Sequence, residues 1–430
     1  MIGSDNKRYK TGVSPMPHDR KKLFQNTLFL YIMIFSNQLI SLLTIPYQTR
    51  VLGPVIYGKT SVAVSLMMYV QLIMDFGFLL SATEKITRYK DDLAFKNRLF
   101  TAVTICKVCL GLLVAGAIYA VCTWIPSLRL DRDLYLLYFL AYSINALVPD
   151  FIYRGQEEMR TITFRTLFIR VFFASLMLIF VTEQSHYLRL PILLFLGNLL
   201  AVLFSFWHVQ RRFGIHFVIP GHTFTKQTVL DSAPFFLSRI ATTFYQALIG
   251  MILGVRFVGQ AVVGYYGASD KILGLVKSVS SPVADSLYPH MVRTKDYSLI
   301  RKILLVTCPV ILLCAVVAYF QAEWICVLMF GEEYRPAAGV LRCMVPAMMV
   351  VLPTYILSFP ALAPIGLSRY ANISNLIGCV TMLVLLGILY LCNYVNVFSL
   401  CIAGSIAEVS VLAFRAVIVW KFRDRMKSGA

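Results

Sequence analysis

Twelve long apolar segments follow one another along the chain, and short polar connections separate them. Each holds roughly 20 residues, the length that an α-helix needs to cross the hydrocarbon core of a bilayer. Their apolar residues run continuously instead of alternating, which favours membrane helices over the strands of a β-barrel. The predicted segments are 25–45, 57–81, 99–122, 134–153, 162–182, 190–209, 231–255, 262–288, 303–320, 338–358, 372–391 and 397–420.

A short sequence repeat divides these segments into two equal sets. The stretch from Arg50 to Gly58 aligns without a gap with the stretch from Arg256 to Gly264, and an Arg and two Gly residues match, including Gly53 with Gly259. We attribute the glycines to sharp turns between neighbouring helices. Six predicted helices separate the two copies, and six is even, so both halves enter the membrane in the same sense. The repeat therefore predicts two parallel halves with one cleft between them.

The predicted fold is an all-α polytopic membrane protein with about twelve transmembrane helices in two six-helix lobes around a central basic cleft. We divide the chain into a cytoplasmic N-terminal tail, an N-lobe with helices 1–6, a cytoplasmic linker, a C-lobe with helices 7–12 and a cytoplasmic C-terminal tail. Their respective residue ranges are 1–24, 25–210, 211–230, 231–420 and 421–430.

The composition agrees with a membrane protein and constrains its orientation. Hydrophobic residues make up 58% of the 430 residues and charged residues only 14%, which is atypical of a soluble domain, and the net charge is +19. Lys and Arg cluster in alternate connections, and the positive-inside rule places such connections in the cytoplasm. This topology explains most of the charge without a nucleic-acid partner and places both termini in the cytoplasm. The clusters lie in the N-terminal tail, at 85–98, 154–165, 211–226 and 293–302, and after 420.

Polar residues inside the predicted helices identify the faces that avoid lipid, because lipid-facing surface must be apolar. In helix 262–288 they fall within a wedge of about 120°. Helices 231–255, 25–45 and 57–81 also carry polar sets, whereas 190–209 and 372–391 are plain, so we expect the first two helices of each half to line the cleft. The sets in helices 7 and 8 are Ser238, Arg239, Thr242, Thr243, Tyr245 and Gln246, and Asp270, Lys271, Gly274, Lys277, Ser278, Ser281 and Asp285.

Cations exceed anions inside the spans. A charge at the bilayer centre costs roughly 3 kcal/mol or more, so an excess of cations indicates an anionic substrate. The alternative is structural: Lys59 and Arg415 would extend to an interface, and Lys277 would pair with Asp270 or Asp285. The cations are Lys59, Lys107, Arg170, Arg239, Lys271, Lys277, Arg342 and Arg415, and the anions are Asp75, Asp150, Asp270, Asp285 and Glu408.

Motifs for nucleotide hydrolysis, serine hydrolysis and zinc binding do not occur in the sequence. We therefore expect a transporter and not an enzyme, with no cofactor and no metal. Proton or sodium coupling stays open.

Several stretches resemble the Wzx-type polysaccharide and O-antigen repeat-unit flippases, within the superfamily that also contains multidrug exporters. The resemblance covers about residues 25–370, and the order and spacing of its motifs carry it. One motif departs from the family pattern, because Arg154-Gly155-Gln156 replaces the usual Gln-Gly. The matching stretches are 46–54 with Tyr57-Gly58, Asp75-Phe76-Gly77-Phe78 with Ser81-Ala82-Thr83, 150–159, 264–272, Leu287-Tyr288-Pro289 and 330–334.

The resemblance implies the twelve-helix, two-lobed fold and a flippase that works by alternating access. Its substrate would be an undecaprenyl-diphosphate-linked oligosaccharide that moves to the outer leaflet of the bacterial inner membrane, for O-antigen, lipopolysaccharide, capsule or exopolysaccharide biosynthesis. The partners would be membrane lipids, the polysaccharide polymerase and the chain-length regulator, with no nucleic acid. A basic cleft fits the diphosphate, because Lys and Arg are the usual partners of phosphate.

We therefore predict substrate contacts from Arg239, Lys271 and Lys277, with Arg50 and Arg256 assisting near the outer mouth. Asp75, Asp270 and Asp285 are expected to be salt-bridge partners or coupling groups. Three alternatives stay open: a cation-coupled multidrug exporter of the same fold, a lipid II flippase, and a scaffold for glycosyltransferases or the polymerase that does not transport. A multidrug exporter would need an acidic cleft, the known lipid II flippases have fourteen helices, and a scaffold would not need charges inside the bilayer.

Overall fold

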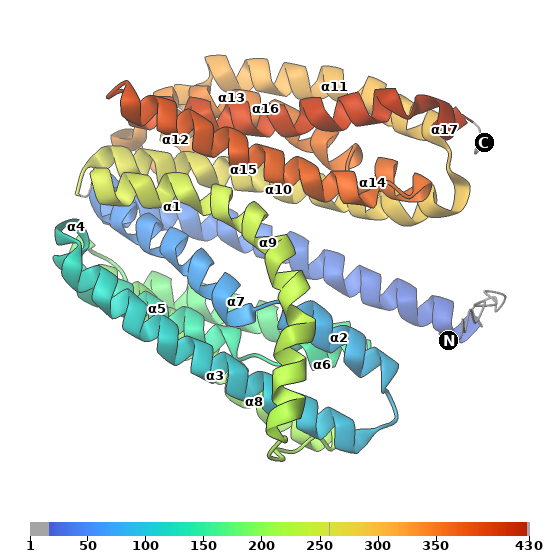
Figure 1. Ribbon diagram of the computed structural model, residues 1–430. Coiled ribbons are helices and arrows are strands. Elements are labelled where there is room, and N and C mark those ends of the chain that lie inside the picture. The colour runs from blue at the N-terminus through green and yellow to red at the C-terminus, as the bar shows by residue number, and fades with distance from the viewer. Residues whose placement is uncertain (1–16, 258, 428–430) are drawn as a thin grey trace.

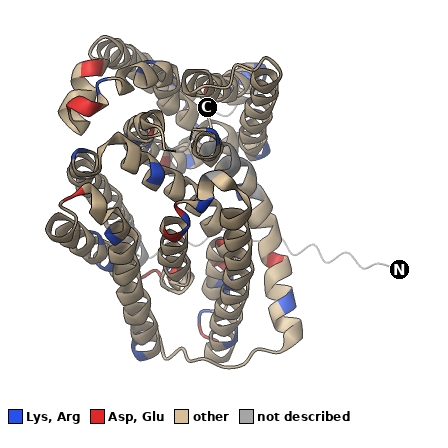
Figure 2. Ribbon diagram, turned by 90° about the vertical axis from the view of Figure 1, so that its left-hand side faces the viewer, with Lys and Arg blue, Asp and Glu red and all other residues tan. Residues whose placement is uncertain are grey.

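The computed structural model describes residues 17–257 and 259–427. Most of the predicted N-terminal tail, residues 1–16, lies outside the described residues, as do Val258 and 428–430. The described chain consists of helices and connections and contains no β-strand. Its long helices run along roughly one direction, and Lys, Arg, Asp and Glu occupy few positions along them (Figures 1 and 2). Within these residues, nine segments are long and apolar enough to cross a membrane, which confirms a multi-pass membrane protein.

The first half of the chain forms eight α-helices and one 3₁₀ helix. These are α1 (Pro17–Asp75), α2 (Phe78–Arg88), α3 (Leu93–Trp124), α4 (Pro126–Arg129), α5 (Arg132–Ala146), α6 (Asp150–Gly155), α7 (Met159–Phe180), η1 (Gln184–Leu188) and α8 (Arg189–Phe213).

The second half forms nine α-helices and two 3₁₀ helices. These are α9 (His222–Arg256), α10 (Ala261–Thr294), α11 (Tyr297–Phe320), α12 (Ala322–Phe330), η2 (Glu332–Tyr334), α13 (Ala337–Ile356), α14 (Phe359–Leu362), η3 (Ala363–Ile365), α15 (Ser368–Leu391), α16 (Val397–Lys421) and α17 (Arg423–Lys427).

Polar side chains at the helix ends satisfy backbone amides that have no partner within the helix. The carboxylate of Asp92 accepts a hydrogen bond from the amide of Phe95 at the start of α3. Asn396 and Ser399 form a reciprocal capping box at the start of α16. These caps stabilise the first turns of α3 and α16 directly after the connections that precede them.

Helix α1 contains a reversal at Gly53. Its backbone there has φ 67° and ψ 169°, a conformation open to glycine, and the two parts of α1 run side by side in opposite directions (Figure 1). Pro54 opens the second part, where a missing amide hydrogen costs nothing. The predicted connection 46–56 is therefore wrong, because helix continues on both sides of a single non-helical residue.

The matched glycines of the repeat serve two different purposes. Gly259, with φ 75°, lies in the connection between α9 and α10, so Gly53 and Gly259 confirm the predicted turns. Gly58 and Gly264 instead lie inside helices and contact each other. A Cβ on Gly58 would lie 2.8 Å from the amide nitrogen of Gly264, and a Cβ on Gly264 would overlap the carbonyl oxygen of Pro54. The two copies of the repeat thus meet in space.

This contact lies at the end of the molecule that we call the Gly53 end. The two halves pack tightly there, because Gly250 and Gly254 of α9 admit Ser65 and Val62 of α1 without room for a Cβ. Two tyrosines from the two halves, Tyr57 and Tyr334, form an edge-on contact with ring centroids 6.3 Å apart. The opposite end, where α2 ends, is called the Lys85 end. Close backbone approach therefore holds the halves together at the Gly53 end.

Helix α9 crosses from one half to the other. It packs against α2 and α3 of the first half as well as α15 and α16 of the second half, and Figure 1 shows it running across the other helices. The predicted linker 211–230 and helix 231–255 have to be corrected here, because α9 already begins at His222 and only 214–221 connect it to α8. The first turns of α9 carry polar and basic residues such as Thr225, Lys226 and Gln227, so the apolar pattern begins only later in the helix.

Candidate functional site

A cavity of about 960 Å³ lies between the two halves. Its lining comes from α1, α2, α3, α5, α6, α7 and α8 of the first half and from α9 and α10 of the second half. The prediction that the first two helices of each half line a cleft is confirmed. The cavity also extends further into the first half than predicted, and α8, which corresponds to the plain segment 190–209, contributes Asn198.

The charged residues that line this cavity are mostly cations. Six cations and two anions lie among its described lining residues. They are Lys107, Arg154, Arg165, Arg170, Arg239 and Lys271, and Asp75 and Asp150. The lining therefore has an excess of positive charge, as the sequence predicted, and it suits a ligand that carries several negative charges.

Asp75 links cations from both halves. One carboxylate oxygen lies 2.6 Å from Nη1 of Arg239 on α9, and the other lies 3.9 Å from Nζ of Lys107 on α3. Lys107 is buried and also donates a hydrogen bond of 2.7 Å to the carbonyl of Ala146. Asp75 is thus a salt-bridge partner, one of the two roles predicted for it.

A second ion pair lies within the first half. Arg165 on α7 donates to the carboxylate of Asp150 at 2.6 Å and to the hydroxyl of Ser205 at 3.0 Å. Its side chain is buried, whereas Asp150 at the start of α6 is partly accessible from the cavity. This pair fixes the wall of the cavity and does not connect the two halves.

Two polar atoms at the cavity have no hydrogen-bond partner in the described chain. They are Nε of Arg154, a donor, and Oδ1 of Asn37, an acceptor, and both are buried. A buried polar atom without a partner costs free energy, and such atoms accumulate at sites that a ligand or water completes. The cavity therefore presents an unused donor and an unused acceptor as well as net positive charge.

The predicted contact residues separate into two groups. Arg239 and Lys271 line the cavity. Lys277 does not belong to its lining and instead forms an ion pair of 2.8 Å with Glu408 on α16. The structural alternative names Asp270 or Asp285 as the partner of Lys277, and the ion pair with Glu408 adds a partner on a different helix. Neither aspartate lines the cavity, and Asp285 is exposed and accepts a hydrogen bond of 3.1 Å from Ser281.

The two predicted arginines of the outer mouth lie at the Gly53 end, away from the cavity lining. Arg50 donates a hydrogen bond of 2.7 Å to the carbonyl of Leu328 on α12, so it joins the two halves. Arg256 is exposed on the last turn of α9. Four residues of the predicted polar set on α9 have side chains outside the described part of the structure: Ser238, Thr242, Tyr245 and Gln246.

Sequence reasoning missed four cavity cations. Lys107 and Arg170 were recognised as charges within spans but were not chosen as contacts. Arg154 and Arg165 were assigned to a cytoplasmic basic cluster, because a linear pattern cannot show that α6 and the start of α7 fold toward the cavity. The proximity of Asp150 to these arginines in sequence was the available signal, since a carboxylate beside a span requires a cation.

The second half contains a cation that the structural alternative places at an interface. Arg415 on α16 is buried and hydrogen-bonds to the carbonyl of Thr354 at 2.6 Å and to the side chains of Ser374 and Asn375 at 2.8 and 2.9 Å. The prediction that it extends to the membrane surface is therefore wrong. Lys59 likewise pairs with Asp131 at 2.8 Å.

Comparison with known proteins identifies the family. A family model described as "Polysaccharide biosynthesis protein" matches residues 23–295, well over half of the chain. The chain belongs to the polysaccharide biosynthesis protein family. This confirms the resemblance inferred from the motifs, several of which lie in the matched range.

Two curated relatives carry the name "Putative O-antigen transporter". The chain is 24% identical to the one from Escherichia coli (strain K12) over 291 residues, which cover 68% of this chain and 70% of the relative. It is 22% identical to the one from Shigella dysenteriae over 400 residues, which cover 91% of this chain and 98% of the relative.

Solved structures of membrane transporters share the all-helical fold of this chain. The lipid II flippase MurJ, in an inward closed conformation, superposes with a TM-score of 0.74 at 12% identity and covers 91% of this chain and 87% of its own. An inward-facing multidrug resistance transporter of the MATE family superposes with a TM-score of 0.66 at 13% identity, covering 92% and 95%. At such identities the likeness concerns the fold alone.

Proposed function

We propose that this protein is a flippase that moves undecaprenyl-diphosphate-linked oligosaccharide repeat units from the cytoplasmic to the outer leaflet of the bacterial inner membrane. It would serve O-antigen, capsule or exopolysaccharide biosynthesis. The observation that carries the proposal is the cavity between the halves, with six cations against two anions in a membrane protein of the polysaccharide biosynthesis family. The names of the two curated relatives, both O-antigen transporters, support it.

The lining fits both parts of such a headgroup. Cationic side chains suit the diphosphate, because Arg and Lys pair with phosphate oxygens through charge-assisted hydrogen bonds. Neutral polar side chains suit sugar hydroxyls, which both donate and accept. The neutral polar residues of the lining include Asn37, Gln38, Ser41, Thr44, Gln48, Gln71, Asn145 and Asn198. The polyprenyl tail would remain in lipid.

We propose that the chain crosses the membrane twelve times and that the Lys85 end faces the cytoplasm. Nine segments meet the length and composition of a span, the first of them reverses at Gly53 and counts twice, and α9 and α10 would complete the set. Three charges in the first half of α10, Asp270, Lys271 and Lys277, lower its apolar content, and several side chains of α9 lie outside the described residues. The basic connections then face the cytoplasm, as the positive-inside rule requires.

Transport would follow from alternating separation of the two halves at their two ends. Arg239 and Lys271 would contact the diphosphate or the first sugar, and the structure adds Lys107, Arg154 and Arg170 as candidates. Arg50 would help to keep the outer end closed through its hydrogen bond to α12. Arg256 would contact the substrate only at the outer mouth.

Complementation tests the proposal. A strain that lacks its own O-antigen flippase should regain surface O-antigen when this protein is produced with a matching repeat unit. Purified protein in proteoliposomes should move a lipid-linked oligosaccharide, and Arg239→Ala should lower the rate at least about tenfold, in line with the loss of a charge-assisted contact. Arg301→Ala removes an exposed cation of α11 outside the cavity and serves as the matched control.

The alternatives give different outcomes in the same system. Rescue of a strain that lacks its lipid II flippase, without rescue of O-antigen, would identify the lipid II substrate. Resistance to cationic drugs would identify a multidrug exporter. A scaffold that does not transport would leave the flippase-deficient strain without surface O-antigen and would move no lipid-linked oligosaccharide in proteoliposomes.

A further inference from the structure

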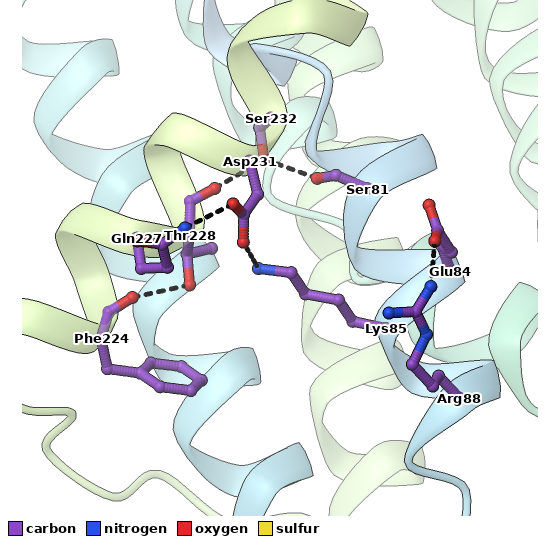
Figure 3. Close-up of polar contacts among 9 residues, drawn as sticks. All are labelled: Ser81, Glu84, Lys85, Arg88, Phe224, Gln227, Thr228, Asp231 and Ser232. Atoms are coloured by element: carbon purple, nitrogen blue, oxygen red, sulfur yellow. Dashed lines mark hydrogen bonds and ion pairs between the residues drawn. The ribbon is translucent and has the colours of Figure 1, made fainter. Parts of the chain in front are cut away.

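A row of polar contacts joins α9 to the first half between the cavity and the Lys85 end. Lys85 on α2 pairs with Asp231 on α9 at 2.6 Å, and the hydroxyl groups of Ser81 and Ser232 lie 2.5 Å apart (Figure 3). At the cavity, the same row ends with the pair of Asp75 and Arg239. We call these three contacts the α9 seam.

Tight packing reinforces the α9 seam. A Cβ on Gly77 would lie 2.6 Å from the carbonyl oxygen of Ser232, and the rings of Phe76 and Phe236 stack with centroids 4.6 Å apart. The seam is thus a continuous contact, and only its Asp75–Arg239 pair lies on the cavity wall.

The carboxylate of Asp75 occupies a position that suits a phosphate. It is an anion in a basic cavity, it pairs with Arg239 of the second half, and it faces Lys107 of the first half. A diphosphate in this place would offer more oxygens and more negative charge to the same two cations. The ion pair that joins the halves and the cations that suit the substrate therefore share their atoms.

We propose that Asp75 is a positioning residue whose carboxylate occupies the diphosphate site until the substrate displaces it, and that this displacement releases the cavity end of the α9 seam. The inference rests on the proposed function and assigns a role within the same cavity. Substrate binding takes Arg239 from Asp75, so the ligand favours the arrangement in which α9 separates from the first half. A ligand can shift such an equilibrium only through its differential affinity for the two arrangements, and competition for Arg239 provides that difference.

Binding measurements on the full-length protein in nanodiscs test the competition. The probe is a C15 prenyl diphosphate, with the C15 prenyl alcohol as the control for partition into lipid. Asp75→Asn should bind the diphosphate about tenfold more tightly, because no carboxylate has to be displaced, while the maximal transport rate in proteoliposomes falls. Asp75→Glu keeps the competing anion and should keep the wild-type affinity.

Two matched variants separate competition from other effects. Asp231→Asn breaks the other ion pair of the α9 seam outside the cavity lining. It removes no competing anion and only weakens the seam, so the affinity for the probe should rise much less than in Asp75→Asn. Asp150→Asn removes the other cavity anion, whose partner Arg165 belongs to the same half. It should leave the response of the α9 seam to the probe intact even if added positive charge strengthens binding.

Cross-linking reports on the α9 seam directly. Ser81→Cys with Ser232→Cys should form a disulfide under mild oxidation, since the two hydroxyl groups lie 2.5 Å apart. A protease site after the exposed Ile219 allows the linked halves to be recognised on a non-reducing gel, and the two single-cysteine variants control for the native thiols. The C15 prenyl diphosphate should slow cross-linking several-fold in this background and in Asp150→Asn, but not in Asp75→Asn.

Unchanged or weaker binding by Asp75→Asn would overturn the inference, and so would cross-linking that ignores the probe in the wild-type background. The cross-linking result does not depend on whether the Asp75 variant folds. If the wild-type protein transports a lipid-linked oligosaccharide but gives either result, the displacement model alone fails. If the wild-type protein transports no such substrate, the proposed function fails.

Discussion

Both halves of the chain have Lys and Arg residues inside their membrane helices, but the partners and the surroundings of these cations differ. In the first half, Lys107, Arg165 and Arg170 line the cavity. In the second half, Arg239 and Lys271 line the cavity as well, but two further cations lie away from its lining: Lys277 pairs with Glu408, and Arg415 hydrogen-bonds to groups of α13 and α15. The two copies of the repeat therefore share their turn glycines, Gly53 and Gly259, while the partners of the membrane cations differ between the halves.

This difference shows when a charge inside a span indicates a binding site. A cation that reaches a water-accessible cavity can exchange its partner for a ligand, whereas a cation that is enclosed by protein acceptors stabilises packing. Two lysines of α10 illustrate the distinction, because Lys271 lines the cavity and Lys277 does not.

The largest effect is expected where a buried ion pair of the second half is broken. Lys277→Ala leaves the carboxylate of Glu408 in a site where its side chain is only 12% exposed, and breaking such a pair costs about 3–5 kcal/mol. The double change Lys277→Met with Glu408→Leu removes both charges and should recover most of the lost stability. Thermal unfolding in detergent compares the stabilities of the single and the double variant. A stability of Lys277→Ala equal to that of the wild type would refute a structural role for the pair.

The contact between the two copies of the repeat comes next in size. Gly264→Ala places a Cβ against the carbonyl oxygen of Pro54, and because backbone has to move, we expect a loss of about 1–3 kcal/mol. Gly387→Ala on α15 adds a Cβ where no atom lies within 4 Å, so it should be neutral or slightly stabilising. The same unfolding measurement compares the two, and equal stabilities would argue against close packing at the Gly53 end.

A cavity cation of the first half should affect transport more than stability. Arg170 is exposed to the cavity, so Arg170→Gln should lower the transport rate about tenfold while the stability changes by less than about 0.5 kcal/mol. Arg160→Gln, an exposed cation on the same helix outside the cavity lining, should leave both unchanged. Transport in proteoliposomes and thermal unfolding give the two quantities. A drop in stability without loss of transport would place Arg170 with the packing cations.

The smallest effect concerns a connection charge outside the spans. Hydrogen bonds from the Ser298 hydroxyl and from the amides of Leu299 and Ser298 lower the pKa of Asp296, which caps α11. A lowered pKa in the folded state contributes stability above the unfolded value of about 4, and this is lost as the pH falls through the folded pKa. Asp296→Ala should therefore flatten the pH dependence of unfolding below about pH 4. If the pH profile of Asp296→Ala equals that of the wild type, this cap does not contribute to the acid dependence of unfolding.

The sequence by itself determined the membrane class, the turns at Gly53 and Gly259 and the family. Each of these depends on local properties: the length of an apolar run, the backbone freedom of glycine, or a motif read in order. It also predicted that polar faces of α1, α9 and α10 meet at a basic cavity, since an amphipathic helix specifies its own buried face.

Only the tertiary structure decided which cations reach the cavity and which partner each one has. Arg165 looks like part of a basic connection, Lys277 looks like a cleft residue, and Arg415 looks like an interfacial one, yet packing assigns them to Asp150, Glu408 and the backbone of Thr354. The partner of a long side chain depends on how helices that are distant in sequence are rotated and brought together. That arrangement results from packing over the whole molecule, and no local pattern encodes it.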